Sequence, residues 1–229
     1  MDAALAEQGL LPAGAFLQKA QDQEFIESLK SDFPFLSILP KGQSLEGLLY
    51  PDTYFITPDA GIAEQLIRAQ LKNFAQKIWT PYERQLVQFR PQGVDLSHYK
   101  ALILASVIEN EEKVASNKPI IAGIFINRLA QGMRLDADVS LCYGLKLTYN
   151  KCRAAIVPNL SDKSNPYNTR QNPGLPPSPI SSPSVASLAA LLKYQKTSAL
   201  YYLHDKNGGI HYGTTLQEHN ENKQRYLNR

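Results

Sequence analysis

An α+β fold is predicted for this 229-residue sequence: a helical core with short antiparallel strands and a long proline-rich loop. Three observations predict it. Apolar residues recur at helical spacing through most of the chain. Two runs of β-forming residues near the C-terminus flank a turn rich in Gly and Asn. Seven of the 15 prolines fall within residues 158–183, and a long ordered loop of this kind usually serves a site.

The composition excludes several classes of protein. With 43% hydrophobic and 20% charged residues, the chain has the composition of a globular protein rather than a disordered or fibrous one. Its net charge of +3 is too small for a nucleic-acid binder, which clusters Lys and Arg against phosphates. The longest apolar runs, such as residues 101–104, are far shorter than the ~20 residues that span a bilayer. Residues 1–4 lack the pattern of a secretory signal, so we expect a chain that is soluble as given.

The first part of the chain is predicted to contain helices and one extended segment. Residues 1–40 have helical apolar spacing interrupted by prolines, which predicts a small helical region at the start of the chain. Residues 45–56 are rich in β-forming residues, and Pro51 limits such a strand to the edge of a sheet. From residue 62 to residue 78 the apolar positions regain helical spacing, and a break is expected at residues 79–81 before a further helical run.

Two helices that form a hairpin are predicted next. Residues 100–115 are apolar through Ile108 and then abruptly charged. The following helix is expected to be capped by Asn117, to carry Pro119 in its first turn and to end at Gly132.

A β-hairpin and a last helix are predicted for the C-terminal region. Residues 199–203 and 210–213 would form the strands around an Asn-Gly-Gly turn. Thr215 and Glu218 have the spacing of a capping box for a helix over residues 216–227.

Sequence motifs exclude several kinds of enzyme. No G-x-S-x-G elbow, P-loop, G-x-G-x-x-G turn or H-E-x-x-H pair occurs, which excludes esterase, NTPase, dinucleotide-binding and zincin classes. The four histidines are spread singly along the chain, so neither a metal site nor a cofactor is predicted.

Glu109 is the first candidate for chemistry. It lies where an apolar helix becomes polar, so partial desolvation would raise its pKa toward the range in which a glutamate donates a proton near neutrality. That property suits a general acid. The alternative is that Glu109 merely opens a solvated run with Glu111 and Glu112, and helix periodicity by itself favours this reading.

Two further acidic positions suggest a sugar site. Glu46 lies among Tyr50 and Tyr54, and carboxylates beside aromatic rings are typical of sugar sites, although a core strand explains them as well. Asp136 and Asp138, two residues apart in an expected extended segment, would point the same way, and Asp138 is a candidate second carboxylate for glycoside hydrolysis. A surface turn explains this pair equally well.

A set of motifs occurs in one order along the chain. They are residues 45–54 (LEGLLYPDTY), 105–111 (ASVIENE), 127–129 (NRL), 132–138 (GMRLDAD), 166–169 (PYNT), 174–177 (GLPP) and 218–220 (EHN). In these motifs the sequence resembles the YceG-like endolytic murein transglycosylases, from about residue 45 to its end.

The sequence departs from the family pattern at two places. The family usually shows Asp-Pro-Thr where this chain has Asp138-Val139-Ser140. An aromatic residue is common where Arg170 follows Asn168-Thr169. Both departures affect the expected shape of loops.

The resemblance implies a lyase that cleaves the MurNAc–GlcNAc β-1,4 bond within nascent peptidoglycan strands and leaves 1,6-anhydro-MurNAc ends. It implies Glu109 as the catalytic residue, first a general acid and then a base. Glu46, Asp138, Tyr143 and Asn168 become candidates for binding the sugar. A single carboxyl suffices because the substrate's own 6-hydroxyl is the nucleophile. Two rivals stay open: a catalytically silent cell-wall glycan-binding or scaffold protein, and a hydrolase that pairs Glu109 with Asp138.

The resemblance also implies a cellular location and a division into domains. Family members face the periplasm from the bacterial inner membrane, held there by an N-terminal helix that this chain does not contain. Residues 1–44 are then expected to be the remnant of a LysM-like module, and residues 45–229 the transglycosylase domain. Peptidoglycan strands are the expected partner, with peptidoglycan synthases as further candidates, and no cofactor is implied.

Cys142 and Cys152 are predicted to form a disulfide. The nine residues between them include Gly144 and Asn150, so the chain can fold back and bring the two Cβ atoms within bonding range. The oxidising compartment that the resemblance implies favours the bond. Two free cysteines are the alternative.

Overall fold

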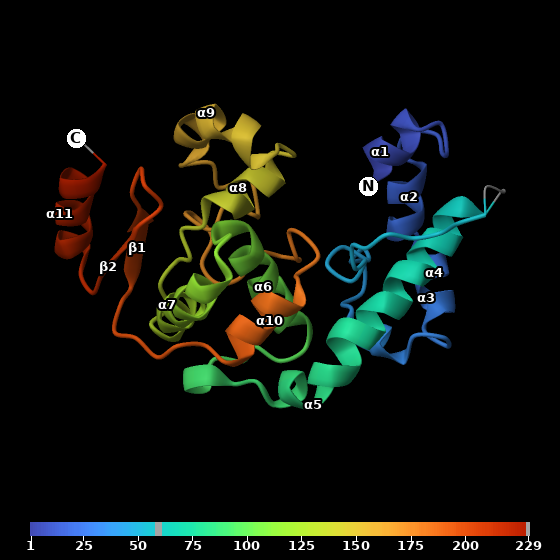
Figure 1. The fold of residues 1–229 in the computed structure, drawn as a ribbon, viewed down its shortest axis with the longest axis horizontal. Helices are drawn as coiled ribbons and strands as arrows, with labels where there is room; N and C mark the ends of the chain where they lie inside the picture. The colour runs from blue at the N-terminus through green and yellow to red at the C-terminus, as the bar shows by residue number, and fades with distance from the viewer. Residues whose placement is uncertain (58–60, 228–229) are drawn as a thin grey trace.

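The computed structural model describes residues 1–57 and 61–227. It is mostly helical with a small two-stranded antiparallel sheet, as the predicted α+β class requires (Figure 1). The α-helices are, in chain order, α1 (Asp2–Glu7), α2 (Ala15–Gln21), α3 (Gln23–Leu29), α4 (Ile62–Phe74), α5 (Thr80–Gln88), α6 (Tyr99–Glu111), α7 (Lys118–Ala130), α8 (Asp138–Gly144), α9 (Tyr149–Asn159), α10 (Val185–Leu192) and α11 (Leu216–Tyr226). Shorter helical turns lie at Pro34–Ile38, Ala75–Trp79, Pro91–Gly93 and Ala115–Asn117, and the strands are β1 (Tyr201–His204) and β2 (Ile210–Gly213).

Helices α1–α3 lie beside α4 at one end of the molecule (Figure 1). They confirm the small helical region predicted for residues 1–40, and their buried side chains belong to the main hydrophobic core. The Phe35 ring, for example, packs on Phe74 of α4 with 5.3 Å between ring centroids. The LysM-like remnant that the resemblance implies for residues 1–44 stays a prediction.

The strand predicted within residues 45–56 is absent, because no part of this segment forms a strand. Leu45 and Leu48, three residues apart, are both fully buried, and the Leu48 N–H donates to the Leu45 carbonyl oxygen at 3.0 Å. Gly47 between them has a φ of +85°, and a Cβ atom there would lie 2.5 Å from Pro179. A tight turn against the proline-rich segment replaces the strand, since no strand among the described residues lies beside it to pair with its backbone.

The break predicted at residues 79–81 is also absent. The chain passes from α4 through the π-helical turn Ala75–Trp79 directly into α5. Pro81 lies in the first turn of α5, where a missing N–H and a fixed φ are tolerated best.

Helix α6 is the centre of the fold. Its residues 101–108 are all buried, and α7, α8 and α10 pack around it (Figure 1). The helix confirms the prediction but ends at Glu111. α7 confirms the second predicted helix, with Pro119 in its first turn and Gly132 at a φ of +67° just beyond its end. The predicted cap is wrong, because the Asn117 side chain makes no capping hydrogen bond.

The predicted C-terminal hairpin and last helix are confirmed. β1 pairs with β2 in antiparallel register, with Tyr202 opposite Tyr212. Thr215 caps α11, because its hydroxyl accepts the Glu218 N–H at 3.1 Å. The hairpin and α11 lie at the end of the molecule opposite α1–α3 (Figure 1).

Candidate active site

A cavity of about 380 Å³ lies at the C-terminal end of α6. Its walls come from α6, α7, the segment leading into α8, the loop around residue 170, β1 and α11. The lining residues are Glu111, Arg128, Leu135, Asp136, Asp138, Arg170, Tyr201, Tyr202, Leu216, His219 and Lys223. Charged and aromatic side chains together suit a polar ligand with apolar faces, such as a sugar.

Glu111 is the last residue of α6 and presents its carboxyl group to this cavity. One oxygen accepts a hydrogen bond from the Tyr202 hydroxyl at 3.0 Å. The other is buried and accepts no hydrogen bond from a described side chain. Burial raises the pKa of Glu111 to about 6, against the Tyr202 hydrogen bond, and the negative charge of Asp138 adds to the rise.

Strand β1 fixes the end of α6 through alternate residues. Tyr202 binds Glu111, and two positions later His204 Nε2 lies 3.1 Å from Glu112 Oε2. Successive side chains of a strand point to opposite faces, so residues two apart reach the same neighbour. Glu112 also accepts the Val114 N–H at 2.7 Å, which ends the helix in a fixed shape.

Arg128 of α7 forms one wall of the cavity and is only 6% exposed. Its Nε donates to the Leu200 carbonyl at 2.6 Å, and its Nη1 donates to the carbonyls of Arg134 and Leu135, both at 3.0 Å. Nη1 also lies 3.1 Å from Asp136 Oδ2. This guanidinium therefore joins the C-terminal segment to the residues that lead into α8.

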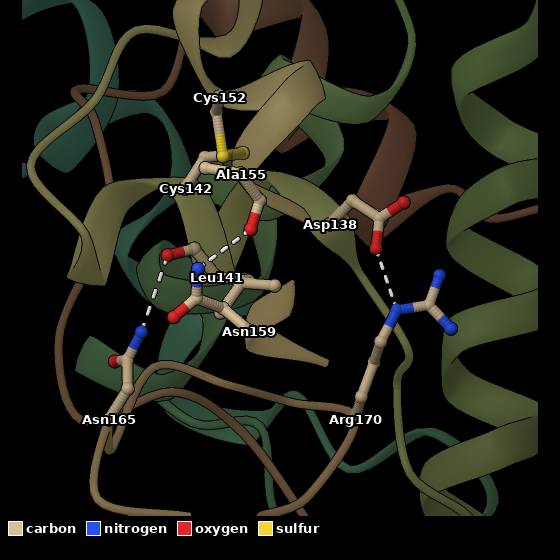
Figure 2. Close-up of a disulfide and its surroundings, with 8 residues drawn as sticks. All are labelled: Asp138, Leu141, Cys142, Cys152, Ala155, Asn159, Asn165 and Arg170. Carbon is tan, nitrogen blue, oxygen red and sulfur yellow. Dashed lines mark hydrogen bonds and ion pairs between the residues drawn. A yellow bond between two sulfur atoms is a disulfide. The ribbon is translucent and has the colours of Figure 1, made fainter. Parts of the chain in front are cut away.

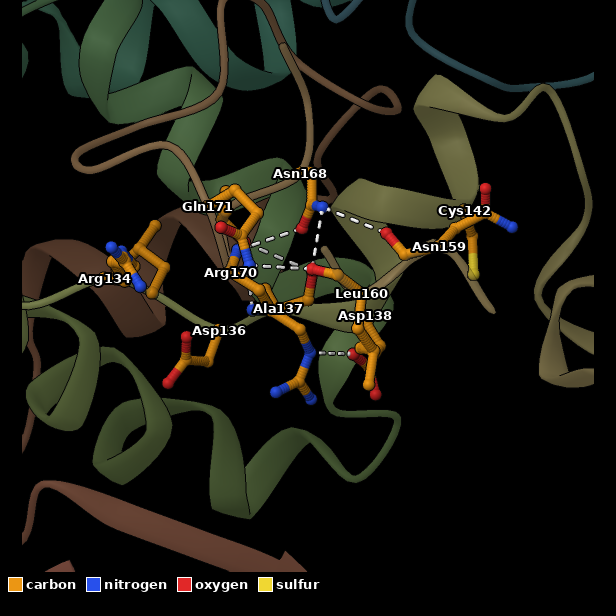
Figure 3. A network of polar contacts seen from close by, with 12 residues as sticks. Arg134, Asp136, Ala137, Asp138, Cys142, Asn159, Leu160, Asn168, Arg170 and Gln171 are labelled. Atoms are coloured by element: carbon orange, nitrogen blue, oxygen red, sulfur yellow. Dashed lines mark hydrogen bonds and ion pairs between the residues drawn. The ribbon is translucent and has the colours of Figure 1, made fainter. Parts of the chain in front are cut away.

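Asp138 and Arg170 form an ion pair beside the cavity (Figure 3). Arg170 Nε donates to Asp138 Oδ1 at 2.7 Å. Thr169 holds the two segments together, because its hydroxyl accepts the Ala137 N–H at 3.0 Å. The extended segment expected at Asp136 and Asp138 is wrong, because Asp136 has a φ of +52° and Asp138 begins α8, but both side chains do line the same cavity.

Asn168 does not line the cavity but lies in a network of polar contacts next to Arg170, which does (Figure 3). It is fully buried, and its side-chain amide donates to the carbonyls of Asn159, Leu160 and Asp162 at 3.2, 3.2 and 2.7 Å. Its own oxygen accepts the Arg170 N–H at 3.2 Å. Asn168 therefore shapes the loop that carries Arg170, and its side chain is not placed to touch a ligand in the cavity.

Glu109 lies outside the cavity walls, in a separate polar cluster. Its Oε2 accepts from the Ser184 hydroxyl at 2.5 Å and from the Ser187 hydroxyl, and Lys118 Nζ lies 3.2 Å away. Burial raises the pKa of Glu109, but these hydrogen bonds together outweigh burial and lower the pKa to about 2. The predicted rise is therefore wrong, because a buried lysine and two serines stabilise the carboxylate form.

Glu46 and Tyr143 come together, but away from the cavity at Glu111. The Tyr143 and Tyr167 rings lie 4.8 Å apart and line a hollow of about 320 Å³ with Gln43 and Ser44. Burial raises the pKa of Glu46. Burial and then the charge of Glu46 raise the pKa of Tyr143. Of the predicted site residues, only Asp138 lines the cavity that holds Glu111.

A disulfide joins Cys142 of α8 to Cys152 of α9, with a Cα–Cα distance of 5.6 Å (Figure 2). The predicted bond is confirmed, and the two helices α8 and α9 bring the sulfurs together. Asn165 supports the same region by donating to the Leu141 carbonyl at 3.3 Å. The disulfide thus holds in place the helix that begins with Asp138.

A hollow over α2 and the metal-ligating side chains of the described residues give no rival site. A hollow of about 660 Å³ lies over α2, but its walls are residues 14–22 alone and bring no distant side chains together. Within residues 1–57 and 61–227, no three His, Cys, Asp or Glu side chains are grouped to hold a metal ion. No helix in this described part is long and apolar enough to cross a membrane.

Comparison with known proteins gives the family. The YceG-like family model matches residues 4–225. The chain belongs to the YceG-like family. It is 32% identical over 231 residues to an endolytic murein transglycosylase of Bacillus subtilis, which covers 98% of this chain and 61% of the relative. An endolytic murein transglycosylase of Streptococcus pneumoniae is 31% identical over 229 residues, covering 95% of this chain and 40% of the relative.

The YceG-like fold is also seen in a solved structure. The 2.6 Å crystal structure of a yceG-like protein from Listeria monocytogenes matches with a TM-score of 0.78 and 33% identity, over 96% of this chain and 70% of that one. This chain spans 40% to 61% of the length of the curated relatives named above. The family match starts at residue 4, so it extends further toward the N-terminus than the motifs do.

Sequence reasoning missed Glu111, Tyr202 and Arg128 as members of this site in the YceG-like chain. Residues 101–108 of α6 are buried on every side, so helix periodicity gives no indication of which end residue meets a cavity. One signal was present in β1, where Tyr202 and His204 alternate with apolar Leu203 and so mark a polar face of the strand.

Proposed function

We propose that this chain is the catalytic part of a peptidoglycan lytic transglycosylase. It cleaves the MurNAc–GlcNAc β-1,4 bond within nascent strands and leaves 1,6-anhydro-MurNAc ends. Family membership over residues 4–225 supports this, together with relatives that are named endolytic murein transglycosylases. A polar cavity with one carboxyl of raised pKa supports the same reaction class.

Glu111 is the general acid and base in this proposal. The observation that carries it is the contrast with Glu109: Glu111 lines the cavity with a pKa of about 6, whereas Glu109 lies in an ion pair with a pKa of about 2. A general acid must hold a proton at working pH, and a carboxyl with a pKa near 6 does so far more often than one near 2. Glu109, which the motif match suggested, is the competing assignment.

The reaction needs two proton transfers from one carboxyl group. Protonated Glu111 gives its proton to the glycosidic oxygen as the C1–O bond breaks, and positive charge develops at C1. The resulting carboxylate then takes the proton of the MurNAc 6-hydroxyl as that oxygen bonds to C1. Glu111 ends protonated, so no water is consumed. Tyr202 holds the carboxyl group in place, and the Asp138 charge stabilises the positive transition state.

The hydrolase rival is less well supported. It pairs Glu109 with Asp138, but Asp138 lines the cavity and Glu109 does not. Asp138 is also held by Arg170 at 2.7 Å, which leaves it poorly placed to activate a water. The silent-binder rival has no use for a carboxyl group whose pKa is raised inside a cavity.

The test is digestion of purified peptidoglycan followed by mass analysis of the glycan ends. Wild-type protein should give ends one water lighter than hydrolytic ends. Glu111→Gln should lower the rate by at least ~10²-fold, since the amide cannot donate the proton. Glu109→Gln is the matched control, and each folded molecule of this variant should be as active as wild type. Loss of activity in Glu109→Gln alone would return the catalytic role to Glu109, and reducing MurNAc ends would indicate a hydrolase.

We also propose where the enzyme acts and what else it contacts. The whole protein faces the periplasm from the inner membrane, beside the peptidoglycan synthases that extend the strand. The hollow lined by Tyr143 and Tyr167 contacts the strand at a distance from the cleaved bond. Burial and then the charges of Tyr167 and Tyr143 raise the pKa of Tyr99, so Tyr99 lies close to this hollow. Tyr99 and Glu111 mark the two ends of α6, ~18 Å apart at 1.5 Å per residue. A long polymer would reach both places.

A further inference from the structure

Arg170 presents unused hydrogen-bond donors beside the cavity that holds Glu111. Its Nε is bonded to Asp138 Oδ1 at 2.7 Å, which fixes the plane of the guanidinium. Neither Nη group is bonded to a described residue, and the side chain is 35% exposed. A guanidinium held at Nε offers two N–H groups in a fixed fork, which matches the two oxygens of a carboxylate.

Arg128, the other arginine of the cavity, is not available in this way. Its Nε and Nη1 are bonded to Leu200, Arg134, Leu135 and Asp136, and it is 6% exposed. The two arginines therefore differ: Arg128 holds the walls together, and Arg170 has donors left for a ligand.

The charges of the cavity favour an anion when Glu111 is protonated. Three cations line it, Arg128, Arg170 and Lys223, against the two aspartates Asp136 and Asp138. With Glu111 neutral, one positive charge is left over. An anion bound here also disfavours the charged form of Glu111, so a negatively charged substrate would help to keep the acid protonated.

We propose that Arg170 forms a carboxylate-binding subsite that selects peptidoglycan strands by their acidic groups. The proposal rests on the proposed function, because it takes the strand as the ligand. Two sources supply such a carboxylate: the peptide stem, or the lactyl group of a MurNAc that carries no peptide. Since an aromatic residue is common at this position in the family pattern, the subsite belongs to this chain rather than to the family as a whole.

Binding measurements with three soluble glycans of equal length test the subsite independently of turnover. The probes are MurNAc–GlcNAc oligomers with peptide stems, the same oligomers without stems, and chito-oligosaccharides, which have no carboxylate. Arg170→Gln should weaken binding of at least one carboxylate-bearing probe by about tenfold and leave chito-oligosaccharide binding unchanged. The probe that loses affinity identifies the source: stems if only the first is affected, the lactyl group if the second is.

Two further variants guard against misinterpretation. Arg134→Gln removes the same charge from an exposed residue close to the cavity but outside its walls, and should change no affinity. Arg170→Lys keeps the charge without the fork and should lie between wild type and Arg170→Gln, which keeps the test valid if Arg170→Gln folds poorly. Equal losses for all three probes, or no loss for any, would overturn the subsite alone. If the wild type binds none of the three probes, both the subsite and the proposed function are overturned.

Discussion

Glu109 and Glu111 are two residues apart on α6 and point about 200° away from each other around the helix. Their surroundings move the two pKa values in opposite directions, to about 2 for Glu109 and about 6 for Glu111. Serine hydroxyls and Lys118 stabilise the charge of Glu109, whereas burial beside Asp138 destabilises that of Glu111. Carboxyl groups whose pKa values are separated in this way suit separate functions, which here means a structural ion pair for Glu109 and proton transfer for Glu111 in the proposed reaction.

We predict that Glu109→Gln destabilises the fold by about 2–3 kcal/mol at pH 7, because Lys118 becomes a buried charge without its anion. The folded-state pKa of Glu109 lies below its usual value of 4.5, so its contribution is present above pH 4.5 and is lost as pH falls toward 2. Urea denaturation at pH 7 and pH 3 measures this. The variant and wild type should be closer in stability at pH 3, and a constant difference would contradict the ion-pair explanation.

Glu111→Gln should change the free energy of unfolding in the opposite direction to Glu109→Gln. We predict that it is about 2 kcal/mol more stable than wild type at pH 8. The folded-state pKa of Glu111 lies above its usual value, at about 6. Its favourable contribution is therefore present below pH 4.5 and is lost as pH rises through 6. At pH 4 the two proteins should be equally stable. A less stable variant at pH 8 would mean that the Glu111 carboxylate is stabilised in the folded protein.

Asp138→Asn should move the pH dependence of activity. A general acid loses activity as pH rises through its pKa, and the Asp138 charge raises the pKa of Glu111. Removing that charge should shift the alkaline limb of kcat/KM to lower pH. Asp32→Asn, which removes a carboxylate from a surface ion pair with Arg68, is the control and should leave the limb in place. An unmoved limb in Asp138→Asn would show that Asp138 does not act on the acid.

At the scale of elements, the disulfide couples α8 to α9 and thereby fixes the helix that starts with Asp138. We predict that Cys142→Ser with Cys152→Ser lowers the free energy of unfolding by about 2–3 kcal/mol, mainly because the unfolded chain regains the freedom of the closed loop. Thermal unfolding of the double variant and of wild type, each with and without a reductant, measures this. Reductant should lower the Tm of wild type only.

The sequence predicted elements better than it predicted their contacts. α6, α7, the hairpin and α11 were found because a long apolar run, a proline in the first turn, a Gly-rich turn and a capping box are local signals. The strand predicted at residues 45–56 is absent because β-forming residues need a neighbouring strand, and here Leu45 and Leu48 are buried in a turn instead. The contrast between the pKa values of Glu109 and Glu111 depends on contacts with residues outside α6. Lys118 of α7 pairs with Glu109, and Tyr202 of β1 donates to Glu111, and only the fold brings these residues to α6.

Across the whole molecule, α7 holds the C-terminal segment against the central helices. Gln195 N–H donates to the Pro119 carbonyl at 2.9 Å, and Asn127 donates to the carbonyls of Thr197 and Ala199 at 2.8 and 3.1 Å. Arg128 adds a further hydrogen bond from α7 to this segment, because its Nε donates to the Leu200 carbonyl. The Asn-Arg pair of the family motif therefore serves to place β1, whose Tyr202 holds Glu111.

Gly123 allows this close approach, because a Cβ atom at this position would collide with the Gln195 backbone carbonyl oxygen. We predict that Gly123→Ala destabilises the protein by about 1–3 kcal/mol, the usual cost of forcing extra atoms into a packed contact. The sign is diagnostic, since Gly→Ala inside a helix free of such contact stabilises by up to ~1 kcal/mol. Displacement of the segment would also move β1 and loosen the Tyr202–Glu111 contact, so kcat should fall along with Tm. A variant more stable than wild type would show that α7 and the C-terminal segment are not packed as described.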